Sequence, residues 1–359
     1  MKLVFFVHSL TSCWNHGNAH FLRGIVRELR VAGHDVEVWE PADGWSRRNL
    51  CERQGSAALD ELESLFPSRL YGRSLDVKRT LAGVDVAVVH EWNEPWLVAA
   101  VGASGVPALF HDTHHRAVTR LEEIHRYDLS NYAGVLAFGR AIADVYRDRS
   151  WHDAVWIWHE AADTAVFRPL PREPKRDVVW IGNWGDGERT RELEEFLFGP
   201  VRRLGLTGTV HGVRYPERGV RAVEESGLDY RGWLPNHRAP EAFAAHRATV
   251  HVPRGPYVEA LPGIPTIRVF EALASGIPLV SAPWDDAEGL FRDGDFLWAR
   301  DGAEMERTLR ELLSDPELGR SIAARGTETI LARHTCAHRV RELLRILDDI
   351  GVGHEEAAA

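Results

Sequence analysis

The chain has 359 residues and a formal net charge of −10, and its 44% hydrophobic and 27% charged content is ordinary for a globular protein. This length favours two domains, each with enough apolar material for a core. The acidic balance disfavours a nucleic-acid partner, because such binding depends largely on basic side chains that neutralise phosphates.

The cysteines and the N-terminal sequence bear on the compartment of the protein. Cys13, Cys51 and Cys336 are widely spaced, which fits neither a disulfide framework nor a metal cluster. Residues 1–10 contain one charge and a short apolar run, as expected of a first β-strand rather than a signal peptide. No window approaches the roughly 18 uninterrupted apolar residues of a transmembrane helix. We therefore expect a protein of the reducing cytoplasm without a transmembrane segment.

Strand and helix patterns alternate along the first half of the chain. Residues 2–8 form a buried strand, apolar residues in 18–33 recur at helical spacing, and residues 35–40 form the next strand. This β-loop-α-β unit is typical of a Rossmann-like half. Further strands are predicted at residues 85–90, 106–110, 134–138 and 154–158, and helices near 57–65, 95–103 and 140–149.

A second series of the same kind follows residues 169–176 (PLPREPKR), which are the best candidate for a domain linker. Strands are predicted at residues 177–182, 207–212, 228–233, 249–252 and 277–281, and helices at 190–204, 220–226, 239–246, 268–273, 304–313, 316–333 and 337–350. Such alternation implies parallel sheets with helices on both faces. We predict an α/β protein of two facing Rossmann-like domains with a central cleft.

The most informative stretch is residues 251–284, which read as strand, loop, helix, turn and strand. The loop Pro262-Gly263-Ile264-Pro265-Thr266 leads into the helix that carries Arg268 and Glu271. A helix entry beside the carboxyl end of a parallel strand binds nucleotides and phosphates in open α/β sheets, because its N–H groups and dipole favour negative charge. We therefore predict that a sugar nucleotide binds here, with Thr266 as a cap or phosphate ligand.

Phrases in both halves resemble those of GT-B glycosyltransferases. The interdomain signature of that fold is similar to Asp163, Thr164, Phe167 and Pro169, and the donor motif of its family-4-type members is similar to Glu271, Ala272, Ala274, Gly276 and Pro278. The loop at residues 14–18 and the strand end at 181–183 resemble the CgeB-like (spore-maturation-protein-like) group. The resemblance is strong in the donor motif and weak in the N-terminal half.

The resemblance implies a hexosyltransferase-like enzyme that transfers a sugar from a nucleotide-diphosphate sugar with retention, without a metal or another cofactor. It implies an acceptor-binding domain at residues 1–168, a donor domain at 169–335 and a helix at 336–350 that crosses back to the first domain. Residues 351–359 are expected to be a disordered tail. The acceptor would be a small molecule, a glycan or a protein, and the enzyme a monomer or homodimer.

The donor-binding residues are expected around two loops of the C-terminal half. By the resemblance Glu271 binds the ribose hydroxyls, although it could instead pair with Arg268 at i, i+3 within the helix. Arg254 suits bidentate contact with a pyrophosphate, the alternative being an exposed loop arginine. The Gly-rich turn after residues 177–182 lets the backbone approach a diphosphate. The full set is Gly182, Asn183, Arg189, Arg254, Pro262, Gly263, Thr266, Arg268 and Glu271.

One position departs from the family pattern. The donor motif usually has the form E-x7-E, and Gly263 stands where the first Glu is expected. Because that Glu commonly lies near the donor sugar, its absence puts the sugar specificity and the retaining assignment in question. Glu259 could substitute if the loop bends back.

In the N-terminal half, histidines fall at or after the predicted strand ends: His8, His16, His90, His111, His114 and His115. A zinc site is an alternative, but the histidines come from four loops and no H-E-x-x-H motif is present. By the resemblance His111 reaches the donor sugar or the acceptor. Asp112 or Glu91 would be a general base if the enzyme inverts, or otherwise structural groups such as helix caps. We assign His111, Asp112 and Glu91 to catalysis and His16, Gly17, Asn18 and His114 to the acceptor.

Other functions remain open on the same fold. A sugar-nucleotide epimerase is the nearest enzymatic alternative, and a catalytically inactive binding scaffold is an alternative of another class. A NAD-dependent dehydrogenase is disfavoured, because neither half has G-x-G-x-x-G after its first strand.

Overall fold

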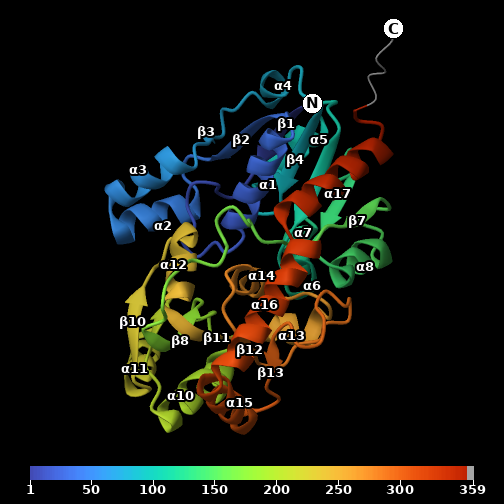
Figure 1. Ribbon diagram of the computed structural model, residues 1–359. Helices are drawn as coiled ribbons and strands as arrows, with labels where there is room; N and C mark the ends of the chain where they lie inside the picture. Colours follow the sequence, from blue (N-terminus) through green and yellow to red (C-terminus); the bar gives the residue numbers. More distant parts are fainter. Residues whose placement is uncertain (354–359) are drawn as a thin grey trace. The chain divides into compact units, whose positions relative to one another are not determined.

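The computed structural model describes residues 1–353 and divides into two compact units (Figure 1). The first unit comprises Met1–Glu160 together with the chain from Cys336 onward, and the second comprises Ala161–Thr335. The Pro-rich residues 169–176 lie inside the second unit. Of the segment expected to be a tail, residues 354–359 lie outside the described residues.

The first unit contains a parallel sheet with the strand order β3-β2-β1-β4-β5-β6-β7. Its strands are β1 (Lys2–Phe6), β2 (Asp35–Pro41), β3 (Arg69–Tyr71), β4 (Val86–His90), β5 (Ala108–Asp112), β6 (Gly134–Ala137) and β7 (Val155–Ile157). β1 pairs with β2 on one side and with β4 on the other, so that Leu3 is opposite both Val36 and Val86. The order therefore reverses between β1 and β4, which is the topological switch point where such sheets bind ligands.

The helices of the first unit are α1 (Ala19–Val31), α2 (Trp45–Gln54), α3 (Ser56–Leu65), α4 (Val77–Thr80), α5 (Pro95–Gly102), α6 (Arg116–Thr119), α7 (Leu121–Ile124), α8 (Arg140–Asp148) and α17 (Cys336–Asp349). The apolar face of α1 is buried, and α17 lies beside α1 (Figure 1). Trp158 is fully buried, and its Nε1 donates to the carbonyl oxygen of Arg339 in α17 at 2.8 Å. The last helix of the chain is thus part of the core of the first unit.

The second unit repeats the arrangement with the strand order β10-β9-β8-β11-β12-β13. Its strands are β8 (Arg176–Ile181), β9 (Gly208–His211), β10 (Leu228–Gly232), β11 (His246–His251), β12 (Leu279–Ser281) and β13 (Leu297–Trp298). The pairs in this sheet are parallel, and the order reverses between β8 and β11. The second switch point therefore lies between the loops that follow these two strands.

The helices of the second unit are α9 (Thr190–Leu193), the π-helix η1 (Glu194–Phe198), α10 (Gly199–Leu204), α11 (Glu217–Glu225), the 3-10 helix η2 (Asn236–Arg238), α12 (Ala239–Ala244), α13 (Gly255–Ala260), α14 (Ile267–Ala274), α15 (Gly302–Ser314) and α16 (Pro316–Arg333). The core contains Trp180 and Phe198 together with the apolar residues of β8 and β11. α14 packs against β11, β12 and α16, which fixes its N-terminus beside the switch point.

Most predicted elements are present. The sequence did not indicate α2, β3, α4, α6, α7, η2, α13 or β13, and the helix predicted at residues 190–204 is interrupted by a π-helical turn. The strand predicted at residues 106–110 ends two residues later, so that His111 and Asp112 are its last residues.

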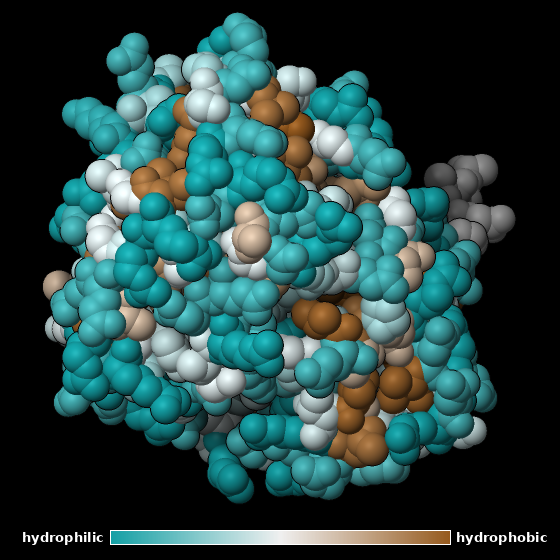
Figure 2. Space-filling model, turned by 90° about the horizontal axis from the view of Figure 1, so that it is seen from below, coloured by the Kyte–Doolittle hydropathy of each residue, from teal (hydrophilic) through white to brown (hydrophobic). Residues whose placement is uncertain are grey.

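The surface view in Figure 2 is mainly hydrophilic, and apolar residues reach it in separate patches. None of the helices in the described part of the chain combines the length and apolar character needed to cross a membrane.

Candidate functional site

A buried arginine joins the two loops at the switch point of the second unit. Nη1 of Arg189 donates to the carbonyl oxygen of Val252 after β11 at 2.9 Å, and Nη2 donates to that of Asn183 after β8 at 2.5 Å. Burial lowers the pKa of Arg189 to about 10, so the side chain keeps its charge at neutral pH. Arg189 therefore fixes the spacing of both loops and places a positive charge between the ends of β8 and β11.

A second bridge at this switch point is partly exposed. Nε of Arg254, at the start of the loop after β11, donates to Oε2 of Glu188 in the loop after β8. The main-chain N–H of Gly255 donates to the carbonyl oxygen of Glu188 at 3.0 Å. The side chain of Arg254 is 25% exposed. Arg254 is thus a cation that a bound anion can reach.

The N-terminus of α14 is tied to the same edge through His251. Its Nε2 lies 3.0 Å from Oγ1 of Thr266, and its Nδ1 lies 2.8 Å from Oγ of Ser281. Burial, aided by the charges of Arg189 and Arg268, lowers the pKa of His251 to about 3, so the ring is neutral. Thr266 occupies the N-cap position but its side chain makes no capping bond. The first N–H groups of a helix have no intrahelical acceptors, so this end can bind an anion.

Glu271 and Arg268 form an ion pair within α14, and Glu271 is fully buried. The i, i+3 pairing of Arg268 with Glu271, which the sequence analysis gave as an alternative, is therefore present.

A glutamate at position 263, in the loop before α14, would distort the backbone. Gly263 has φ +85°, and a Cβ at this position would lie 2.5 Å from Cγ of Glu288. Both the left-handed backbone and the crowding favour glycine. The carboxylate that reaches this position is that of Glu288, whereas Glu259 is exposed on α13.

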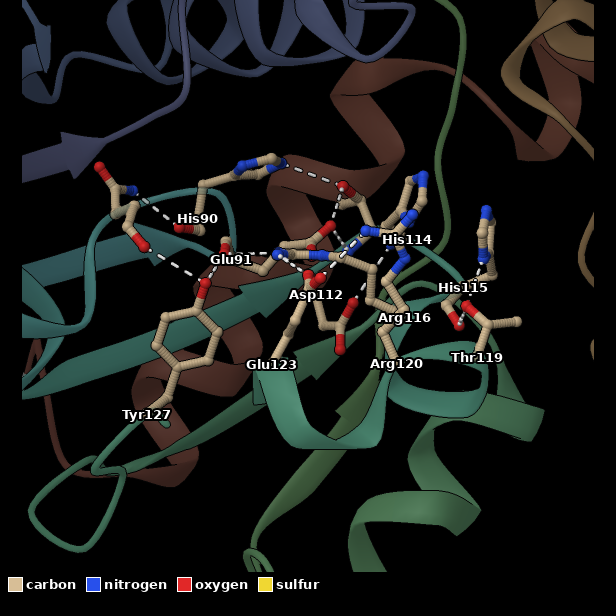
Figure 3. A network of polar contacts seen from close by, with 12 residues as sticks. His90, Glu91, Asp112, His114, His115, Arg116, Thr119, Arg120, Glu123 and Tyr127 are labelled. Atoms are coloured by element: carbon tan, nitrogen blue, oxygen red, sulfur yellow. Dashed lines mark hydrogen bonds and ion pairs between the residues drawn. The ribbon is translucent and has the colours of Figure 1, made fainter. Parts of the chain in front are cut away.

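In the first unit, a buried ion pair joins Glu91, the residue after β4, to Arg116 in α6 (Figure 3). Nε of Arg116 donates to Oε2 of Glu91 at 3.0 Å, and Nη2 donates to the carbonyl oxygen of Glu91 at 2.7 Å. Nη1 of Arg116 reaches Glu123 at 3.2 Å, and the hydroxyl of Tyr127 donates to the main chain of Glu91. Burial raises the pKa of Glu91, and the charge of Arg116 opposes this effect.

Asp112 lies beside this pair and is fully buried. The hydroxyl of Tyr146 donates to its Oδ2 at 2.8 Å, and the N–H of His114 donates to its Oδ1 at 3.2 Å. Burial and the neighbouring charge of Glu91 raise the pKa of Asp112 to about 8. Burial thus favours the protonated carboxyl group, whereas the hydrogen bonds from His114 and Tyr146 favour the ionised one.

Four of the histidines expected at this edge form a row of rings. The ring centroids of His8 and His16 are 5.0 Å apart, those of His16 and His90 6.2 Å, and those of His90 and His111 5.4 Å. Burial lowers the pKa of each, so all four are neutral. Among the described residues, Nδ1 of His90 and Nε2 of His111 have no hydrogen-bond partner, which is uncommon for buried nitrogens. Residues 1–353 contain no group of three His, Cys, Asp or Glu side chains arranged to hold a metal ion.

The loop at residues 14–18 meets the end of the β7 segment. Nδ2 of Asn18 donates to Oε1 of Glu160 at 2.6 Å, and burial raises the pKa of Glu160 to about 7. Gly17 is half-buried in the same loop, and Nε2 of His16 donates to the carbonyl oxygen of Ser9 at 3.1 Å. Glu160, Tyr146 and Arg116 were not found from the sequence, because their partners lie far away along the chain.

The structure therefore groups the sequence-predicted residues in three places. In the first unit, His111, Asp112, Glu91, His114 and His16 lie along one sheet edge, with Asn18 bound to Glu160. In the second unit, Asn183, Arg189 and Arg254 bridge the switch point, and Gly182 precedes them directly. Pro262, Gly263, Thr266, Arg268 and Glu271 belong to the α14 entry.

Comparisons with known proteins agree with this architecture. Residues 189–345 match the family model described as "Glycosyl transferase-like". None of the curated proteins compared with the chain is significantly similar to it in sequence.

Solved structures match over nearly the whole chain at low sequence identity. T4 phage BGT in complex with UDP-glucose superposes with a TM-score of 0.63 and 14% identity over 98% of this chain and 99% of that chain. Sucrose-phosphate synthase from Thermosynechococcus elongatus gives 0.67 and 13% over 98% and 99%. Anabaena HepE in complex with UDP and glucose gives 0.66 and 14% over 97% and 100%.

At these identities the likeness establishes the fold. The chain is an α/β protein of the GT-B fold with two Rossmann-like domains, and it carries a glycosyltransferase-like domain in residues 189–345.

Proposed function

We propose that the protein is a glycosyltransferase that uses a nucleotide-diphosphate sugar bound to the second unit. The observation that carries this proposal is the pair of arginine bridges at the β8/β11 switch point, beside the N-terminus of α14. Glycosyl transfer releases a diphosphate, so the enzyme must stabilise negative charge that develops on the leaving group. The match of residues 189–345 to a glycosyltransferase-like family model supports the same reading.

Each donor-site residue then has a role that follows from its contacts. Arg254 and the N–H groups of α14 bind the diphosphate, while Arg189 holds Gly182, Asn183 and the loop after β11 in position. Pro262, Gly263 and Thr266 shape the α14 entry. Glu271, oriented by Arg268, binds the ribose, in line with the resemblance of its motif. Glu288, rather than Glu259, reaches the neighbourhood of Gly263 and is our candidate for a contact with the donor sugar.

Uridine is the proposed base, because T4 phage BGT binds UDP-glucose and HepE was solved with UDP and glucose. We further propose transfer of a hexosyl group with retention, and membership of the CgeB-like group.

No resident metal is required in this proposal, since arginines and a helix N-terminus supply positive charge. A T4 phage BGT complex contains UDP and Mn²⁺, so hydrolysis of UDP-glucose should be measured with and without EDTA. Loss of activity in EDTA would refute metal independence.

The first unit is proposed to bind the acceptor and to supply the acid–base groups. His111, Asp112 and Glu91 are the catalytic candidates, and His16, Gly17, Asn18 and His114 the acceptor-binding candidates. Because burial raises the pKa of Asp112, it is our candidate for the proton donor, and Glu91 would act mainly by holding Arg116. We propose a cytoplasmic enzyme whose acceptor domain spans residues 1–168 and whose donor domain spans 169–335.

Thermal unfolding with UDP, GDP, TDP and CDP tests the donor site. UDP should raise the unfolding temperature of the wild type, and Arg254→Ala and Glu271→Ala should reduce that rise. Arg310→Ala is the matched control, because Arg310 pairs with Glu306 on the exposed face of α15. An absence of stabilisation by all four nucleotides would refute the donor site. UDP binding without hydrolysis or transfer would favour an inactive scaffold, and conversion of the UDP-sugar without transfer would favour an epimerase.

A further inference from the structure

Trp92 is an exposed aromatic residue at the switch point of the first unit. It follows β4 by two residues, beside the loop that follows β1, and is 39% exposed. Large aromatic side chains are usually buried, and a solvent-exposed indole at a sheet's ligand-binding edge is available to bind a ring. The catalytic roles proposed above do not use it.

One face of the Trp92 indole lies against an arginine whose side chain is fixed by other contacts. The guanidinium of Arg116 lies 3.8 Å from the centroid of the Trp92 ring. Arg116 is itself held by the side chain and main chain of Glu91 and by Glu123. A ring supported in this way loses little conformational freedom when a ligand binds to it, so binding energy is not spent on ordering the side chain.

The imidazole rings of His114 and His8 lie next to the Trp92 indole. The ring of His114 is 5.0 Å away at 74°, and the ring of His8 is 5.9 Å away at 49°. Neither ring is parallel to the indole, so they do not form a second wall that would sandwich a planar aromatic ligand. They can instead exchange hydrogen bonds with hydroxyl groups at the rim of a ligand.

The charges around Trp92 favour a neutral ligand. Burial lowers the pKa of His8 to about 4, so its ring is uncharged at neutral pH. The positive charge of Arg116 is compensated by Glu91 and Glu123. Neither His8 nor Arg116 offers an uncompensated positive charge, so an anionic ligand would lose hydration here without gaining an ion pair from these two groups.

We propose that Trp92 is the binding platform for the acceptor and that this acceptor is a neutral sugar. The apolar C–H face of a sugar ring packs on the indole, and its hydroxyl groups bond to His8 and His114. This inference rests on the proposed glycosyltransferase function and specifies the acceptor class at the first unit.

Ligand-observed NMR with methyl β-D-glucopyranoside, maltose and cellobiose tests the proposal on the full chain. Saturation transfer from the protein should reach the ring C–H protons of at least one sugar, and Trp92→Ala should weaken its binding about tenfold, which corresponds to the loss of one favourable ring contact. Trp92→Phe should retain most of the affinity, because it keeps an aromatic face. Trp298→Ala is the matched control, since Trp298 is 40% exposed but belongs to β13 of the second unit.

Several outcomes would overturn the proposal. These are no binding of any of the three sugars, binding that Trp92→Ala leaves unchanged, or stronger Trp92-dependent binding of glucuronate or 4-nitrophenol than of the sugars. Thermal stabilisation by UDP, measured on the same variants, checks their folding and separates the two hypotheses. Loss of sugar binding with intact UDP binding concerns Trp92 alone, whereas absence of UDP binding in the wild type concerns the proposed function.

Discussion

At the scale of single residues, Arg116 is the centre of the polar network in the first unit. Its guanidinium bonds to Glu91, contacts Glu123 and supports the indole of Trp92. One arginine therefore orders a catalytic candidate and the proposed acceptor platform together. Because Glu91 is fully buried, removing the arginine would leave a carboxylate without its charge partner.

We predict that Arg116→Met lowers the free energy of unfolding by about 3 kcal/mol, because a buried carboxylate loses its partner. Urea denaturation followed by circular dichroism measures this value. Arg120→Met is the control, since Arg120 is largely exposed and pairs only with Glu123 among its charged contacts in residues 1–353; its loss should stay below about 1 kcal/mol. Equal losses for the two variants would contradict a special role of the buried pair.

Asp112 gives a prediction about pH. Its folded-state pKa is raised to about 8, chiefly by burial and secondarily by Glu91, so the folded protein binds a proton that the unfolded chain releases near pH 4. Stability from this group is therefore greatest in acid and falls as the pH rises toward 8. Asp112→Asn should remove that loss. The Asn variant should gain stability relative to the wild type, by at least about 1 kcal/mol, between pH 5 and pH 8.

Urea unfolding of both proteins at the two pH values measures this difference. Contributions from other titrating groups largely cancel, although Glu91, Arg116 and Tyr146 face Asp112 and are coupled to it. A difference that does not change with pH would mean that Asp112 is ionised throughout.

At the scale of elements, the backbone of the α14 entry favours glycine at position 263. Gly263→Glu would restore the sequence motif, but it would force a side chain into a left-handed backbone and against Glu288. We predict a loss of stability of about 2 kcal/mol, in the range expected for backbone strain with crowding.

Gly289→Glu separates the two causes, since Gly289 also has positive φ but would place its Cβ in open space. The Gly263 variant should be the less stable of the two by thermal denaturation. If the two variants are equally stable, crowding by Glu288 is unimportant. If Gly263→Glu is neutral, the loop can accommodate a side chain at position 263.

The sequence predicted those elements whose pattern is decided locally. β1 and β4 are nearly continuous apolar runs and α1 has a regular apolar face, so each was predictable. α2 is polar and has little amphipathic character, and α13 begins with Gly-Pro after an arginine, so both resembled loops. The order of the strands, and hence the switch points, depends on tertiary pairing that no local pattern contains.

The same distinction applies to the candidate sites. The positions of Arg189, Arg254 and the α14 entry at the ends of strands were predictable from the sequence, while their part in phosphate binding stays a proposal. The pairs Asn18–Glu160 and Tyr146–Asp112 join residues far apart along the chain, so only the structure reveals them. The pKa changes of Asp112 and Glu160 come mainly from burial, which a single sequence does not give for a polar residue.

At the scale of the whole molecule, the two units differ in the number of chain segments that form them. The second unit is continuous, from Ala161 to Thr335, whereas the first is completed by α17 from the C-terminal end. Nε of Arg339 in α17 donates to the carbonyl oxygen of His159 at 2.9 Å, and the carbonyl oxygen of Arg339 accepts from Trp158. The C-terminal helix therefore closes the same segment that carries Glu160.

This difference predicts how separate fragments behave. A fragment of residues 161–335 should fold cooperatively and be stabilised by UDP, because the arginine bridges and the α14 entry belong to it. A fragment of residues 1–160 should not fold alone, since the surface of α1 that packs on α17 and the indole of Trp158 would be exposed to water. Adding residues 336–353 through a flexible linker should restore it.

Thermal unfolding and hydrogen exchange of the three fragments provide the measurement. A folded second-unit fragment that does not respond to UDP would mean that residues outside it are needed for donor binding. A cooperative transition in residues 1–160 alone would mean that α17 adds stability without being required. UDP binding by the fragment 161–335 would support a donor site built within the second unit. Folding of the fragment 1–160 only when α17 is added would support a first unit that depends on the last helix of the chain. Both results together are what we expect.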